Sequence, residues 1–124
     1  MSILIGKHIK KVLSKLSDKV SGGIFLEGLN REANYPYIVY EYSVQPDADT
    51  KDGSMFNCGV SVKIYSTDGD SSIELAEEVR KLMIKSESAN DEFMTLGTEF
   101  VNYRGSFDGG VYERELDFNI KTTD

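Results

Sequence analysis

Apolar and polar residues alternate with a period of two over residues 56–65, and apolar residues recur at helical spacing over residues 71–83. The first pattern predicts a strand with one buried face, and the second predicts an amphipathic helix. A polar turn at residues 66–70 separates them, and Ser71 with Glu74 has the spacing of a capping box at a helix start. Because both apolar sides need cover, we expect this helix to pack back on the sheet.

A second apolar stripe predicts a helix at the N-terminus. Its members recur at helical spacing and are Ile5, Ile9, Val12, Leu13, Leu16 and Val20. Gly22 and Gly23 end this helix, because glycine readily adopts the left-handed conformation found after a last helical turn. His8 is the single histidine of the sequence and lies at the edge of the stripe, so we interpret it as a packing residue.

Further strands are predicted at residues 24–27, 37–44, 100–103 and 111–122, which are rich in β-branched and aromatic residues. Asp108 and Gly109 favour a tight hairpin turn, and residues 45–54 are expected to form an exposed hairpin tip. The element order is therefore helix, three strands, helix, two strands. We predict one α+β domain over residues 1–124, with a single mixed, mainly antiparallel sheet of about five strands and both helices packed on one face.

The charge distribution divides the chain. Five lysines and one aspartate give residues 1–20 a net charge of +4, although the whole chain carries −7. This balance argues against general nucleic-acid binding. A basic helix on an acidic body favours head-to-tail packing between copies or docking on an acidic surface, while a solvated lysine face remains the alternative. The one cysteine, Cys58, falls in the apolar phase of its strand and is expected to be a buried, reduced thiol.

The sequence lacks the motifs of common catalytic and cofactor sites. It has no glycine-rich phosphate loop, no Cys/His cluster for zinc and no partner for His8 in a triad. Asp47, Asp49 and Asp52 resemble the start of a calcium loop, but Cys58 occupies the twelfth position, where such a loop needs glutamate. We therefore predict a protein that is not an enzyme and has no cofactor or metal site. No stretch approaches the ~18 apolar residues of a membrane span, so we expect no membrane partner.

Several local patterns resemble the tail completion, or tail terminator, proteins of long-tailed bacteriophages. The matching segments are Tyr35-Pro-Tyr-Ile-Val39, the polar hairpin tip 49–53, Val62-Lys-Ile-Tyr-Ser66 before a short polar turn, Ala76-Glu-Glu-Val79 in the next helix, and the closing hairpin from 100–103 to 112–120. The resemblance covers nearly the whole chain. The family often has tryptophan where this chain has Tyr65.

The resemblance implies a structural protein of a phage or prophage virion, made in the cytoplasm of the bacterial host. In this family a ring of about six copies caps the tail tube and ends its growth. The implied partners are other copies of the chain, the major tail tube protein and the head–tail connector, with DNA passing through the lumen without specific binding. The alternatives are a head–tail connector or another virion or contractile-injection component of the same fold, and, in a different class, a small ligand-binding or enzymatic domain.

Ring closure requires two different patches that bind each other head to tail. We expect part of this interface on the hairpin tip and part on the side of strand 56–65 that faces away from the core. The candidate interface residues are Asp47, Asp49, Lys51, Asp52, Asn57, Ser61, Lys63 and Tyr65.

Overall fold

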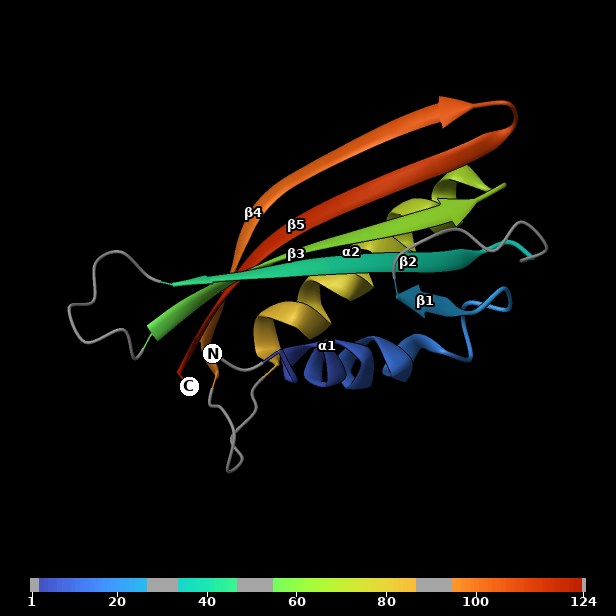
Figure 1. The fold of residues 1–124 in the computed structure, drawn as a ribbon. Coiled ribbons are helices and arrows are strands. Elements are labelled where there is room, and N and C mark those ends of the chain that lie inside the picture. Colours follow the sequence, from blue (N-terminus) through green and yellow to red (C-terminus); the bar gives the residue numbers. More distant parts are fainter. Residues whose placement is uncertain (1–2, 27–33, 47–54, 87–94, 124) are drawn as a thin grey trace.

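The computed structural model describes residues 3–26, 34–46, 55–86 and 95–123 of the chain. In this part, helices and strands follow one another in the predicted order (Figure 1). The elements are α1 (Ile5–Leu13), the 3-10 turn η1 (Ser14–Leu16), β1 (Ile24–Leu26), β2 (Tyr37–Pro46), β3 (Met55–Ser66), α2 (Gly69–Lys85), β4 (Thr95–Asp108) and β5 (Val111–Thr123).

The strands form one sheet in the order β1-β2-β3-β5-β4. β1 runs parallel to β2, and the pairs β2–β3, β3–β5 and β4–β5 are antiparallel. Both helices lie against the same face of this sheet (Figure 1). The prediction of an α+β fold with a mixed, mainly antiparallel sheet and two helices on one face is therefore confirmed.

The alternating pattern of β3 places its apolar residues in the core. Phe56, Cys58, Val60, Val62 and Ile64 are all buried, and the last four join the buried stripes of α1 and α2 in one core cluster. Burial raises the pKa of the Cys58 thiol to about 12, so this cysteine stays protonated and unreactive, as the sequence predicted.

α2 begins earlier than the capping-box pattern predicts. Asp68 is the N-cap, since its carboxylate accepts a hydrogen bond from the backbone N–H of Asp70 at 3.2 Å. The hydroxyl of Ser71 donates to the same carboxylate at 2.7 Å instead of capping the helix itself. A negative charge at this end also complements the helix dipole, which favours aspartate over serine as the cap.

The N-terminal helix is shorter than predicted. Its α-helical part ends at Leu13 and continues only as the 3-10 turn η1, so Val20 is buried outside any helix. The Ser14 hydroxyl donates to the carbonyl of Lys10 at 2.6 Å, a local bond that competes with regular helix geometry. Gly23 has a positive φ of 101° and ends this segment.

β4 is much longer than the predicted strand 100–103. It pairs with β5 from Thr95 to Asp108, and its register shifts between Thr95 and Gly97 and again between Phe100 and Asn102. Each shift breaks the period-two pattern on which the prediction relied. None of the helices in the described part of the chain is both long and apolar enough to cross a membrane.

Candidate assembly surface

The face of the sheet opposite the helices, here called the open face, has no described element packed over it (Figure 1). Strand register aligns its side chains in rows that run across the sheet. In order β2, β3, β5, β4, the central rows are Tyr37-Tyr65-Glu113-Ser106, Val39-Lys63-Glu115-Arg104, Glu41-Ser61-Asp117-Asn102 and Ser43-Gly59-Asn119-Glu99.

The candidate residues on β3 all lie on the open face, but each is half-buried and bound to β5. Asn57 accepts from the Asn119 amide at 3.1 Å, and Ser61 donates to Glu115 Oε1 at 3.1 Å. Lys63 Nζ lies 3.9 Å from Glu115 Oε1, and the Tyr65 hydroxyl donates to Glu113 Oε1 at 3.4 Å. The other candidates lie outside the described residues: Asp47, Asp49, Lys51 and Asp52.

Glu115 is the centre of the polar network on this face and is only 6% exposed. It forms an ion pair with Arg104 and receives the contacts from Lys63 and Ser61. The hydrogen bond from Arg104 lowers the pKa of Glu115 and outweighs the opposing effect of burial. Glu115 therefore does not lie on a solvated sheet edge, because β5 is inside the sheet between β3 and β4.

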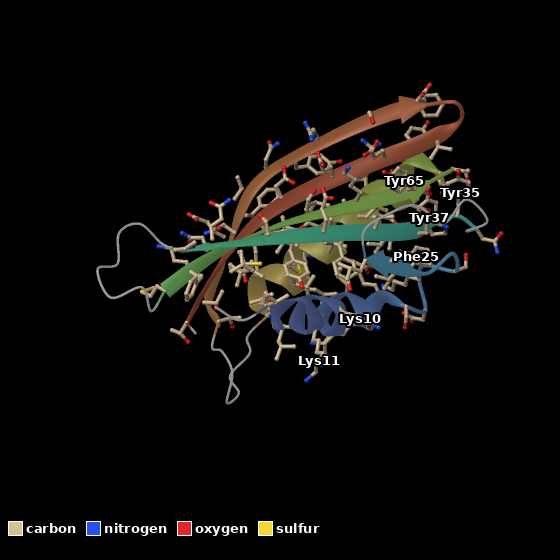
Figure 2. The ribbon with its side chains drawn as sticks, in the orientation of Figure 1. Lys10, Lys11, Phe25, Tyr35, Tyr37 and Tyr65 are labelled. Atoms are coloured by element: carbon tan, nitrogen blue, oxygen red, sulfur yellow. The ribbon has the colours of Figure 1, made fainter. Side chains whose placement is uncertain are left out.

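One end of the open face carries a group of aromatic rings (Figure 2). The Tyr37 ring stacks on Tyr65 with centroids 4.9 Å apart, and Tyr35 and Phe25 lie 5.4 and 6.3 Å from it. Tyr35 is 41% exposed, whereas Tyr37 is buried. Burial, with Glu113 beside it, raises the pKa of Tyr65 to about 12. An exposed tyrosine on a rigid aromatic base is common in protein interfaces.

A hollow of about 560 Å³ lies at the middle of the open face, and Gly59, which has no side chain, is among its lining residues. Its polar lining includes Ser43, Ser61 and Asn119. It also includes the carboxylates of Glu41 and Asp117, and none of the described basic side chains lines it. Among the described residues these carboxylates make no hydrogen bond or ion pair. We call this feature the acidic hollow.

The outer side of the N-terminal helix has the opposite charge. Lys7, Lys10, Lys11 and Lys15 are exposed there, on the side of the helix opposite its buried stripe. Figure 2 shows Lys10 and Lys11 at the surface of α1. None of the four is ion-paired within the described part of the chain, whereas Lys19 pairs with Glu78 of α2. We call these four lysines the basic side.

His8 packs beneath the basic side, as the sequence predicted. It is buried, and its Nε2 has no hydrogen-bond partner among the described residues. Burial lowers its pKa, and the nearby charges of Lys11 and Lys15 act in the same direction. The described residues also hold no group of three or more His, Cys, Asp or Glu side chains that could bind a metal ion.

Sequence reasoning missed Glu41, Asp117, Arg104 and Tyr37 as parts of this surface. Glu41, Asp117 and Tyr37 stand beside predicted candidates in the rows across the sheet, and Arg104 stands beside Glu115, but this adjacency depends on strand order and register. The charge contrast between the N-terminal segment and the rest of the chain was the available signal for the basic side.

The fold is shared with a chain of a solved structure whose title is "Virion of native gene transfer agent (GTA) particle". The two chains superpose with a TM-score of 0.81 at 11% sequence identity, and the match covers 100% of each. No protein-family model and no curated protein sequence matches this chain. At this identity the likeness shows a common fold.

Proposed function

We propose that this chain is a structural component of a phage-like virion rather than an enzyme. The observation that carries the proposal is the full-length likeness to a chain of a gene transfer agent virion, with a TM-score of 0.81 over 100% of both chains. A match over the entire length relates the whole fold of the two chains, and not only a common supersecondary motif.

Within the virion, the chain acts as a tail terminator. It forms a ring, about six copies in the related phage proteins, that caps the tail tube and stops its growth. The support is the resemblance of Tyr35-Pro-Tyr-Ile-Val39, Val62–Ser66 and Ala76–Val79 to that family. These segments form the start of β2, the end of β3 and the middle of α2, which are adjoining parts of one fold.

The ring contacts the major tail tube protein on one side and the head–tail connector on the other. DNA passes through its lumen without specific binding, which suits a chain with a net charge of −7. The chain is made in the cytoplasm of the bacterial host and ends in the virion tail. The open face, with Asn57, Ser61, Lys63 and Tyr65, supplies part of the contact between copies.

The second candidate function is a head–tail connector or another virion component, because the fold likeness to a virion chain does not specify a position in the particle. Deleting the gene separates the two. Loss of a terminator gives tail tubes of irregular length in electron micrographs. Loss of a connector gives tails of normal length that fail to join heads. Normal, fully joined particles after deletion would contradict both.

The hairpin tip is tested separately. Deleting residues 47–52 should weaken ring assembly if Asp47, Asp49, Lys51 and Asp52 contribute to the contact. Rings and tube lengths identical to those of the intact chain would remove the tip from the interface while leaving the open face as a candidate.

A further inference from the structure

We propose that the basic side of one copy docks on the acidic hollow of the next copy. The inference deepens the proposed function and rests on it, since a closed ring needs two different and complementary patches on each chain. The basic side and the acidic hollow form such a pair, and they lie on opposite sides of the molecule. One belongs to the helix layer and the other to the uncovered face of the sheet (Figure 1).

No described residue forms an ion pair with the four lysines of the basic side. Lys7 and Lys11 are four residues apart in α1, so they lie about 6 Å apart along the helix axis and repel each other. Lys15 continues the row into η1. Of the five lysines in residues 1–20, only Lys19 has an ion-pair partner among the described residues. A row of this kind is stabilised by an anionic partner that lies along it.

The acidic hollow has the matching charge and shape. Glu41 and Asp117 stand on either side of Ser61 in one row, about 10 Å apart at the usual strand spacing. Lys63 and Arg104, the basic side chains of the next row, both pair with Glu115; Arg104 also feels the charge of Asp117, but no described residue forms an ion pair with Glu41 or Asp117. The hollow therefore accepts ammonium groups between its two carboxylates.

Apolar surface around the hollow accommodates the rest of a lysine side chain. Val101 contributes to the lining and is largely exposed. The methylene stems of lysines pack on such surface while their charged ends reach the carboxylates. Gly59 leaves room for this approach, since it presents no side chain to the incoming helix.

Charge reversal tests the contact. Variant A is Lys7→Glu with Lys11→Glu, and variant B is Glu41→Lys with Asp117→Lys. In each variant alone, like charges face each other across the contact. We therefore expect its self-association to be weaker than that of the unchanged chain by about tenfold or more. An equimolar mixture of A and B restores association, because every contact then joins opposite charges. Sedimentation and light scattering at low ionic strength measure this, and electron microscopy identifies rings or filaments.

A matched control carries the same change of net charge elsewhere. Lys81→Glu with Lys85→Glu alters exposed lysines of α2 and should associate like the unchanged chain. Circular dichroism confirms that all variants are folded. The inference is overturned by folded variants whose mixture stays dissociated, by a control that weakens association as much as variant A, or by an unchanged chain that stays monomeric at its highest soluble concentration.

The remaining outcome concerns nucleic acid. If variant A loses binding to duplex DNA while its self-association is unchanged, the basic side serves DNA and the inference is wrong. Failure here is distinguishable from failure of the proposed function. If gene deletion gives irregular tail tubes but mixing variants A and B does not restore association, the proposed function is supported and only this contact is wrong. If mixing the variants restores association but gene deletion gives normal particles, the contact is supported and the proposed function is wrong.

Discussion

The two faces of the sheet are built by different means. The covered face is held by apolar residues on β3, β5 and both helices, each visible in the sequence as a period of two or of 3.6. The open face is held by bonds across strands, such as those from Arg104, Lys63 and Ser61 to Glu115. The covered face therefore determines the stability of the fold, whereas the open face presents a rigid polar surface that other molecules can bind.

The largest expected effect comes from removing a core side chain. Phe118→Ala empties a site that is 2% exposed and should lower the free energy of unfolding by about 3–5 kcal/mol. Its control, Phe107→Ala, removes the same ring from a site that is 59% exposed and should cost less than about 1 kcal/mol. Denaturant unfolding measures both. Similar losses would contradict the division between a covered core and an exposed strand.

A smaller effect is expected from Glu115→Gln on the open face. The change removes the charge that Arg104 and Lys63 share and should cost about 1–2 kcal/mol at neutral pH. Because folding lowers the pKa of Glu115, its contribution is present above the unfolded value of 4.5 and is lost as the pH falls through the folded value. Unfolding of the variant should thus depend less on pH in this acidic range. Glu99→Gln, on exposed β4, is the control and should retain the pH dependence of the unchanged chain.

The titration of His8 makes the stability of the covered face depend on pH, and this dependence can be measured. Because its folded pKa is lowered, its stabilising contribution is full above the unfolded value of 6.5 and declines as the pH falls towards the folded value. His8→Phe removes this proton uptake and leaves no unpaired ring nitrogen. We expect the variant to unfold at higher denaturant concentration than the unchanged chain at pH 5, with a smaller difference at pH 8. A constant difference at both values would disprove a role for His8 titration.

The smallest effect is expected from removing the hydroxyl of Tyr65. Tyr65→Phe keeps the ring stacked on Tyr37 and loses only the long hydrogen bond to Glu113, at a cost of less than about 0.5 kcal/mol. Tyr65→Ala also loses the stacking and should cost about 2 kcal/mol more. Thermal unfolding of the pair measures the difference. Equal losses would show that the hydroxyl, and not the ring, stabilises this end of the open face.

The difference between the covered face and the open face explains which parts of the structure the sequence predicts. The apolar alternation of β3 and the stripe of α2 are local, so they predict the helices, the strands and the covered core. Two register shifts in β4 hide its length, because each one reverses the pattern from which a strand is recognised. The network around Glu115 joins β3, β5 and β4 across the sheet, and no local pattern shows which residues meet there.

The acidic hollow was equally invisible in the sequence. Its carboxylates, Glu41 and Asp117, are distant along the chain and meet only through the register of β2, β3 and β5. Local charge did reveal the other half of the proposed contact, since the lysines of the basic side cluster within one short segment. The partner surface becomes apparent only once the strands are in order.

The central claim is that copies of this chain assemble in a virion through the open face of the sheet. Cryo-electron microscopy of purified particles tests it most directly, because it places each copy and its neighbours. We expect a closed ring at the end of the tail tube, with α1 of each copy against the open face of the next. A particle without this chain, or a ring in which the open face of every copy remains uncovered, would contradict the claim.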